Sequence, residues 1–582
     1  MTADDEASAD KMNPIPSASV PIEEEPVEEA FFDTVNSDTV PPRYELRPRS
    51  TLRHPEKFDD YVSNVNTFTD PQSYREAIKS PLREKWEDVM KKELVSLKEN
   101  DVWTLSELPP NRKALSSKWV YRIKRNPDGS VDKFKARLVV KGFKQRKGVD
   151  YDQTFSPVAR MATIRALISV AAKERLVLTQ FDVSTAFLYG KLQEDIYMDQ
   201  PDGFNDGSMK VWKLKRSLYG LKQAPRCWNS CFAEILLDLG FTQSDADSCL
   251  FVKKINGKKL LITLYVDDGL VAATDAEVTK EFLKDLQKRL KITTKSASYY
   301  LGLEIIQDDD GSISIKQEFY TKKILERFHM ADCNPLSTPI QKESVTLTTE
   351  TGKVVERKKD FPYREAVGAL TYLMVGTRPD IAYAVGIASR KLENPDELDW
   401  LMVKKIFRYL KGTSSFGIKY KSDHPKDFIT GYSDADHGGD QTTGRSTTGV
   451  TCLYAGGAVS WLSQRQPSVS ISTTEAEIVA ASEATKELIW LQRIFSQLTQ
   501  IKEIPTLFVD NEAAVRLAYN PEFHKRTKHI RIRHFFVREK VLDGQLTVER
   551  ISTTDQLADM FTKPMPRPRL VILKKRIGLT HC

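Results

Sequence analysis

Cysteine is scarce in this sequence, and long apolar runs are missing. Six cysteines are scattered through 582 residues, a usage that suits a reducing compartment better than a disulfide framework. No stretch of 18 consecutive apolar residues occurs, so we expect no transmembrane helix. The first residues are acidic and contain no apolar segment of the kind found in signal peptides. The length instead predicts three or four globular domains.

Charge is distributed unevenly along the chain. The net charge is +7, but residues 1–33 carry ten acidic side chains and one lysine, a net charge of −9, so the rest of the chain carries +16. A folded body this basic favours a polyanionic partner, most simply nucleic acid, although a merely solvated basic surface would show the same charge. Residues 1–70 mix Pro, Glu and Ser without periodicity, which predicts a disordered tail.

The first candidate catalytic site is the tetrapeptide Tyr265-Val266-Asp267-Asp268. It lies between two apolar runs and therefore predicts a β-hairpin with an acidic tip. Two adjacent carboxylates on a tight turn repel each other, so such a site makes sense mainly with a bound cation. Asp182 ends another apolar run upstream, and three aspartates on strand ends can hold two Mg²⁺ for phosphoryl transfer. An isolated Asp-Asp pair is more often an ordinary turn, so its context has to decide.

A second set of four acids follows in a new α/β pattern that starts near residue 428. The order is an acid after a strand, an acid in the first turn of a helix, an acid after a strand, and an acid in the final helix. These residues are Asp434, Glu477, Asp510 and Asp559. Without a metal these four converging carboxylates would repel strongly, whereas two Mg²⁺ would polarise a phosphodiester and activate water. Each acid alone is explained by helix or turn capping, and Asp436 and Glu475 are alternative ligands.

Several ordered motifs resemble the Pol polyprotein of copia-type long-terminal-repeat retrotransposons. The blocks similar to its reverse transcriptase are residues 135–142, 181–188, 218–225 and 265–268, and those similar to its ribonuclease H are residues 472–477 and 524–530. The resemblance covers about residues 70–570, and agreement of so many ordered motifs by chance is negligible. It suggests that the chain is the C-terminal portion of a longer polyprotein.

The resemblance implies a multidomain α+β and α/β protein, in which a right-hand polymerase with fingers, palm and thumb precedes a ribonuclease H-like α/β domain. The implied division is a disordered acidic then basic tail at 1–70, fingers and palm at 71–315, thumb or connection helices at 316–425, the ribonuclease H-like domain at 426–565, and a basic C-terminal tail at 566–582.

Further site residues follow from the same resemblance. Lys124 and Arg137, on a hairpin predicted at 118–141, would contact the triphosphate, Phe187 would exclude a 2′-hydroxyl, and Gln223 would belong to the nucleotide pocket. Spacing alone favours core packing for Phe187 and leaves Gln223 equally explained as a helix-start residue. A basic stripe predicted to contact the backbone of an RNA–DNA hybrid contains Lys525, Arg526, Lys528, Arg531 and Arg533. Gly269 stands where the family carries a bulky aliphatic residue, which predicts a looser hairpin.

The implied activity is RNA- and DNA-directed DNA synthesis combined with cleavage of RNA in RNA–DNA hybrids. Each active site would hold two Mg²⁺, with Mn²⁺ as an alternative. The expected partners are an RNA template, a DNA primer, the hybrid, dNTPs and the integrase and capsid portions of the same element, without a membrane. The expected location is cytoplasmic virus-like particles, or the nucleus. The rival hypothesis is a decayed or domesticated relative that binds nucleic acid without catalysis; the presence of all seven acids argues against it.

Overall fold

The computed structural model describes residues 69–125, 130–341, 361–501, 503–520 and 531–582. The tail predicted at residues 1–70 lies outside these ranges except for its last two residues. Residues 70–582 form one compact unit. None of the helices in the described ranges combines the length and the apolar character that crossing a membrane requires.

The predicted basic hairpin is confirmed, and it is anchored through one face. Side chains alternate between the two faces of a strand, and Trp119, Tyr121 and Leu138 are buried on the same face. There the Tyr121 ring meets the Trp86 ring of the preceding helix edge-on, with 5.2 Å between centroids. The elements of this region are α1 (Tyr74–Lys79), α2 (Arg83–Glu99), β2 (Ser117–Arg125), β3 (Val131–Val140) and a small sheet of β1 (Trp103–Ser106), β6 (Val211–Arg216) and β5 (Lys191–Met198).

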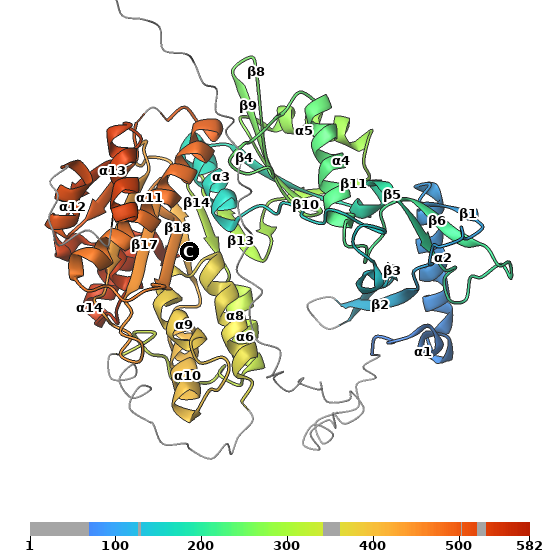
Figure 1. The fold of residues 1–582 in the computed structure, drawn as a ribbon, viewed down its shortest axis with the longest axis horizontal. Helices are drawn as coiled ribbons and strands as arrows, with labels where there is room; N and C mark the ends of the chain where they lie inside the picture. The colour runs from blue at the N-terminus through green and yellow to red at the C-terminus, as the bar shows by residue number, and fades with distance from the viewer. Residues whose placement is uncertain (1–68, 126–129, 342–360, 502, 521–530) are drawn as a thin grey trace, which may run out of the picture. The chain divides into compact units, whose positions relative to one another are not determined.

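A six-stranded antiparallel sheet carries the acidic hairpin, in the strand order β11-β4-β10-β9-β8-β7. Its central strands are apolar because both faces are covered. Ile262 and Val271 pack with Phe232 of α4 and Phe282 of α5 (Figure 1 shows both helices beside β10). The elements are α3 (Met161–Glu174), β4 (Val177–Val183), α4 (Ala224–Asp238), β7 (Thr242–Gln243), β8 (Leu250–Ile255), β9 (Lys258–Tyr265), β10 (Asp268–Ala273), α5 (Ala276–Gln287) and β11 (Ile292–Ser296).

A five-stranded sheet draws on three distant parts of the chain. Its order is β12-β13-β14-β15-β21, and β15 pairs with β14 on one side and with β21 on the other. The sheet therefore contains strands from both sides of the predicted division after residue 315 and takes its last strand from beyond residue 565. The strands are β12 (Tyr299–Tyr300), β13 (Leu303–Gln307), β14 (Ile313–Lys316), β15 (Phe416–Tyr420) and β21 (Leu579–His581).

The prediction of a basic tail after residue 565 is wrong. Residues Arg567–Arg576 form helix α14, which buries Leu570 and Leu573. Lys574 is buried as well, and its ammonium donates to the hydroxyl of Tyr409 at 2.9 Å. The charge of the segment suggested a solvated tail, whereas the apolar residues between its basic ones dock it onto the protein.

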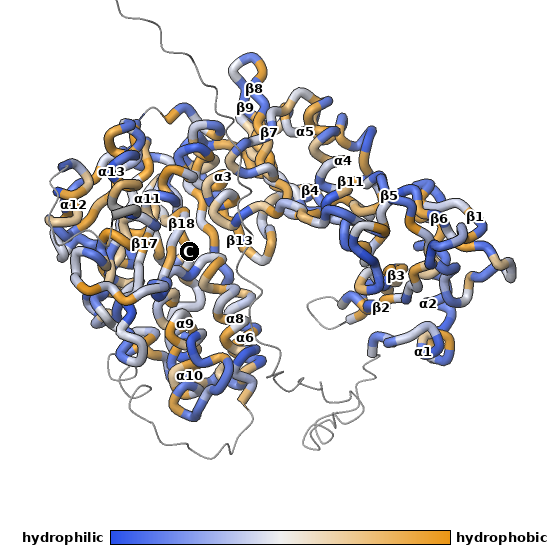
Figure 2. Tube along the Cα trace, viewed as in Figure 1, coloured by the Kyte–Doolittle hydropathy of each residue, from blue (hydrophilic) through white to orange (hydrophobic). Residues whose placement is uncertain are grey.

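Four helices of the described residues lie between positions 317 and 412, in the region where the resemblance implies thumb or connection helices. They pack together through apolar faces, and α10 shows alternating hydrophilic and hydrophobic stretches along its length (Figure 2). This alternation is expected of a helix with one buried face. The helices are α6 (Glu318–Arg327), α8 (Tyr363–Gly376), α9 (Ala382–Ser389), which follows a short 3₁₀ turn, and α10 (Glu397–Lys411).

The last sheet is mixed, with the strand order β18-β17-β16-β19-β20. Strands β16, β17 and β18 run antiparallel, whereas β19 is parallel to both β16 and β20. Helix α11 packs on this sheet beside α13 (Figure 1). Parallel pairing brings the carboxyl ends of β16 and β19 to one edge. The elements are β16 (Thr430–Ala435), β17 (Thr447–Tyr454), β18 (Gly457–Arg465), α11 (Thr473–Leu498), β19 (Thr506–Val509), α12 (Glu512–Tyr519), α13 (Arg531–Leu542) and β20 (Thr547–Arg550).

A buried arginine links helix α3, which packs on the six-stranded sheet, to this last sheet. Arg165 of α3 donates to the carbonyl of Val459 on β18 at 2.6 Å and to that of Gly376 on α8 at 3.0 Å. Its guanidinium also lies 4.0 Å from the ring centroid of Trp461. A buried guanidinium needs such partners to offset its lost hydration, so α3, α8 and β18 form one packed junction.

Candidate active sites

At the acidic hairpin Asp182 and Asp268 are cross-strand neighbours, and Asp267 precedes Asp268 in the turn. Asp182 on β4 is the register partner of Asp268 on β10, so their side chains lie on one face of the sheet. Val266, at the tip, has a φ of 57°, a conformation that β-branched residues rarely adopt. The backbone N–H of Val183 donates to Asp267 O at 2.9 Å, which holds this strained tip against β4.

Burial and mutual repulsion perturb these carboxyls. Burial, with the charges of Asp267 and Asp182, raises the pKa of Asp268 to about 6. Burial, together with Asp182, also raises the pKa of Asp267, while Arg137 and Lys135 oppose the shift. When these carboxyls are ionised they therefore repel one another, and a bound divalent cation would offset that repulsion.

Gly269 does not leave a gap in the hairpin. It is the register partner of Phe181 on β4, and a Cβ atom at position 269 would lie 2.1 Å from Cζ of the Phe181 ring. The ring thus fills the place that a bulky residue at 269 would take. The looser hairpin predicted from the glycine is not what the structure shows.

We expect Gly269→Ala to lower the free energy of unfolding by about 1–3 kcal/mol, because the added methyl overlaps the buried Phe181 ring. Urea denaturation measures this change. Gly368→Ala in α8 is the control, since a Cβ atom there meets nothing within 4 Å. Equal stability of the two variants would show that Phe181 moves aside freely.

One face of the β2–β3 hairpin is basic. The register places Arg122 opposite Lys135 and Lys124 opposite Lys133, and Arg137 lies on the same face. Lys124 is exposed and Arg137 is half-buried. Since Arg137 and Lys135 act on the pKa of Asp267, this face lies within electrostatic reach of the acidic tip and suits a polyphosphate.

Tyr219 connects Arg137 to Phe187. The Arg137 guanidinium lies 4.3 Å from the Tyr219 ring centroid, and the Phe187 ring meets the same tyrosine edge-on at 5.0 Å. Burial raises the pKa of Tyr219 to about 12 despite the opposing charge of Arg137, so the hydroxyl stays protonated. Tyr219 lies in the block 218–225 that resembles the reverse transcriptase, but no role was predicted for it from the sequence.

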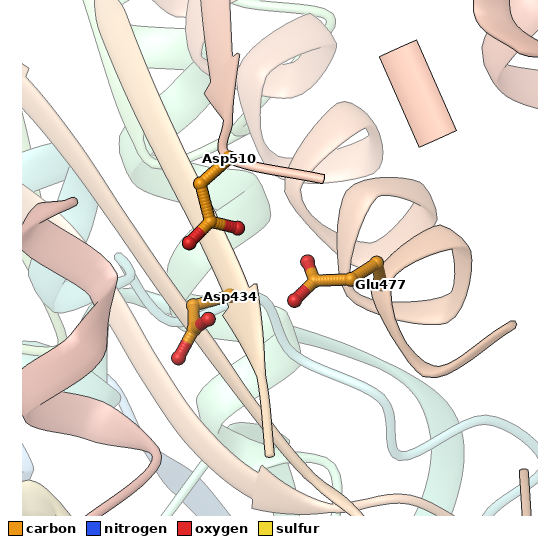
Figure 3. A group of neighbouring side chains, drawn as sticks. All are labelled: Asp434, Glu477 and Asp510. Atoms are coloured by element: carbon orange, nitrogen blue, oxygen red, sulfur yellow. The ribbon is translucent and has the colours of Figure 1, made fainter. Parts of the chain in front are cut away.

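The second acidic cluster forms at the edge where β16 and β19 end. Carboxylate oxygens of Asp434, Glu477 and Asp510 lie within 4.8 Å of one another, and the three side chains point toward a common centre (Figure 3). Ser433 on β16 and Val509 on β19 are register partners, so Asp434 and Asp510, the next residue in each case, lie side by side. Glu477 reaches them from the first turns of α11.

Two of these carboxyls are deeply buried. Burial, with the charges of Asp434 and Asp510, holds the pKa of Glu477 well above its usual range, and burial raises the pKa of Asp434 to about 6. Glu477 Oε1 accepts from the backbone N–H of Ala435 at 3.3 Å, whereas its buried Oε2 has no hydrogen-bond partner among the described residues. An unsatisfied buried carboxylate oxygen facing two other carboxylates fits a divalent cation.

Asp559 reaches the same edge but is engaged by cations. It lies on a 3₁₀ turn, Leu557–Phe561, not on the α-helix that the sequence predicted. Lys563 Nζ lies 2.6 Å from Asp559 Oδ1 and 3.7 Å from Asp434 Oδ2, and Arg569 donates to Asp559 at 3.4 Å. Asp559 is thus ion-paired at the border of the cluster.

Comparison with known proteins identifies the family of the chain. Residues 100–342 match the family model described as reverse transcriptase (RNA-dependent DNA polymerase). The chain is 39% identical over 552 residues to a retrovirus-related Pol polyprotein from transposon TNT 1-94 of Nicotiana tabacum, covering 93% of this chain and 41% of that protein. It is 32% identical over 311 residues to a putative transposon Ty5-1 protein of Saccharomyces cerevisiae, covering 53% of this chain and 100% of that protein. This chain belongs to the copia-type retrotransposon Pol family.

This Pol chain spans about two fifths of the length of its tobacco relative. Among solved structures, a ribonuclease H1 isolated from compost by a metagenomic approach is 17% identical, with a TM-score of 0.20, covering 24% of this chain and 94% of that chain. A likeness at this TM-score says nothing about function.

Gln223 of the Pol chain is placed inside the protein. Its side chain is 1% exposed. Its amide nitrogen donates to Asp150 O at 2.9 Å, and its amide oxygen accepts from Gln145, also at 2.9 Å. Both ends of the amide are hydrogen-bonded within the protein. This geometry favours a role for Gln223 in holding residues 145–150 against the start of α4 over a direct contact with a nucleotide.

The alternative ligands and the basic stripe occupy other places. Asp436 accepts from the backbone N–H of Thr447, and Glu475 accepts from that of Ile471 at 2.7 Å in the cap of α11. Of the stripe, Lys525, Arg526 and Lys528 lie outside the described residues, while Arg531 begins α13 and Arg533 is half-buried within it.

Proposed function

We propose that this Pol chain copies RNA and DNA templates into DNA at the Asp182–Asp267–Asp268 centre. The observation that carries the proposal is the register pairing of Asp182 with Asp268 beside the strained tip that bears Asp267. Paired strands hold Asp182 and Asp268, and a backbone hydrogen bond from Val183 holds the turn that bears Asp267, as catalysis by positioning requires. Mg²⁺-dependent incorporation of dTTP on a poly(rA)–oligo(dT) template tests it.

We further propose that Asp434, Glu477 and Asp510, with Asp559 at their border, cleave the RNA strand of the resulting hybrid. The supporting observation is the convergence of three carboxylates within 4.8 Å, one with an unsatisfied buried oxygen. Release of labelled fragments from the RNA strand of a hybrid measures this activity directly.

The donor sets of both centres consist of carboxylate oxygens, which Mg²⁺ and Mn²⁺ accept. When bound, such cations would activate the attacking hydroxyl or water and offset the charge of the leaving oxygen. The chain itself holds the carboxylates at fixed positions. We propose that Lys124 and Arg137, on the basic hairpin face, bind the triphosphate, and that Tyr219 keeps the Arg137 guanidinium oriented by lying against it.

We expect Phe187→Val to raise the ratio of ribonucleotide to deoxyribonucleotide incorporation by about tenfold, because removing the ring opens room for a 2′-hydroxyl. Single-nucleotide extension with each triphosphate measures the ratio. Phe204→Val is the control, since that ring packs against Trp119 of the hairpin. An unchanged ratio in Phe187→Val would assign Phe187 to core packing alone.

The proposed basic stripe predicts a loss of phosphate contacts when it is neutralised. Replacing Arg531 and Arg533 with glutamine should weaken hybrid binding for every sequence and reduce the salt dependence by about two counterions' worth of slope. Binding titrations across a salt series measure the slope. Lys540→Gln is the control, because that lysine is already paired with Glu539 at 2.8 Å; identical slopes in all three proteins would make the stripe structural.

The proposed division keeps a fingers and palm region at 71–315, thumb or connection helices at 316–425, and a nuclease region at 426–565. Helix α14 and strand β21 follow it, and β21 pairs with β15 of the preceding region. RNA template, primer, hybrid and dNTPs are the proposed partners, together with the integrase and capsid portions of the element. Cytoplasmic virus-like particles are the proposed location. If neither DNA synthesis nor RNA cleavage is found, the protein is instead a relative that binds nucleic acid without catalysis.

A further inference from the structure

Lys563 lies inside the proposed nuclease centre without belonging to its acids. Its ammonium is 2.6 Å from Asp559 and 3.7 Å from Asp434, and its side chain is 42% exposed. The cation thus stands between the fourth acid and the other three.

Three of the four acids form a group that does not include Asp559. Asp434, Glu477 and Asp510 gather at one point, while Asp559 also receives Arg569 at 3.4 Å. If all four carboxylates are ionised, as a bound divalent cation favours, these two cations leave two negative charges, which one divalent cation balances. Without Lys563 and Arg569, the same four acids would balance two divalent cations.

A second contact keeps Asp434 in this arrangement. The hydroxyl of Thr562 donates to Asp434 Oδ2, the same oxygen that faces Lys563. Gln556, fully buried, donates to the carbonyl of Ser433 at 2.9 Å and so fixes the 3₁₀ turn that bears Asp559 against β16. The segment from Gln556 to Lys563 is therefore held to the strand that carries Asp434.

We propose that the Lys563 ammonium supplies, beside Asp559 and Asp434, positive charge that a second cation would otherwise supply. The nuclease centre of the free protein would then bind one divalent cation through Asp434, Glu477 and Asp510, while Asp559 stays paired with Lys563. The inference rests on the proposed nuclease function. Lys563 is a positioning residue for this centre: it sets how many cations the acids bind before any substrate arrives.

Counting bound Mn²⁺ by electron paramagnetic resonance, on the full chain without nucleic acid, tests this. A background with Asp182→Asn, Asp267→Asn and Asp268→Asn removes the acids of the proposed polymerase centre. This protein should bind one Mn²⁺ at its nuclease centre, and Lys563→Met should bind a second or bind the first about tenfold more tightly. Lys563→Arg should behave like the parent.

Two further variants separate the possible failures. Lys486→Met is the control for loss of a lysine, because Lys486 pairs with Glu483 on the surface of α11 at 2.7 Å; it should leave Mn²⁺ binding unchanged. Glu477→Gln should weaken binding, and if it does not, the proposed nuclease centre itself fails. If Lys563→Met unfolds, Lys563→Gln replaces it.

The remaining outcomes decide the inference alone. Binding of two Mn²⁺ by the parent, or unchanged number and affinity in the folded neutral variant while Glu477→Gln weakens binding, overturns the role of Lys563 and leaves the nuclease proposal standing. A second ion that appears in Lys563→Met and not in Lys563→Arg supports it.

Discussion

Asp267→Asn is expected to reduce Mg²⁺-dependent dTTP incorporation by roughly a thousandfold or more. The substitution keeps the size of the side chain but removes a charge from the strained tip between β9 and β10, where Asp267 and Asp268 together would hold the cations. The backbone contact from Val183 to Asp267 O does not involve the side chain, so the hairpin should keep its shape. Primer extension on poly(rA)–oligo(dT), with protein in excess of template, measures the loss.

Asp285→Asn is the matched control for this experiment. Asp285 is half-exposed on α5 and pairs with Lys288 at 2.7 Å, so its substitution removes an aspartate charge from the same region without touching the acidic tip. It should leave extension unchanged. Full extension by folded Asp267→Asn would contradict the assignment of the polymerase centre.

Glu477→Gln is expected to reduce cleavage of the RNA strand by a similar factor while DNA synthesis continues. Glu477 contributes an unsatisfied buried oxygen to its cluster, and the neutral amide cannot replace that donor to a cation. The two acidic centres lie on different sheets, so loss of one should spare the other. An end-labelled RNA strand and a labelled primer, followed in the same reaction, report both activities.

Glu483→Gln, two turns further along α11, is the control for the helix. Glu483 pairs with Lys486 at the surface, so both activities should persist. Persistent RNA cleavage by Glu477→Gln would show that the four-acid assignment is wrong and would direct the next test to Glu475, although that carboxylate caps α11 in the structure.

Local patterns predicted the elements that bear the acids, because apolar periodicity and capping residues act over a few positions. The strands ending at Asp182 and Asp434 and the first turn of α11 are confirmed as structural elements. The relations between distant segments were not predictable in this way. The pairing of β15 with β21 joins residues more than a hundred positions apart, and only the packed structure shows that the C-terminal segment completes a sheet.

The other differences between the predictions and the structure arise from the partners of individual side chains. Gln223 was predicted to belong to the nucleotide pocket, yet its amide is hydrogen-bonded to Gln145 and to the carbonyl of Asp150. Gly269 suggested looseness until the Phe181 ring was seen to fill its space. Lys563 gave no signal of its own, because a lysine four residues after an aspartate is an ordinary helical ion pair; its approach to Asp434, 129 positions upstream, is what places it in the centre.

A single reaction with two labels reports both proposed activities. The full chain is incubated with Mg²⁺, dTTP and a primed RNA template whose RNA and primer strands carry different labels, and both strands are followed over time. We expect the primer to lengthen and the RNA strand within the hybrid to be cut. Salt-dependent binding of the hybrid with neither extension nor cleavage, in Mg²⁺ and in Mn²⁺, would contradict this expectation and identify a nucleic-acid binder without catalysis.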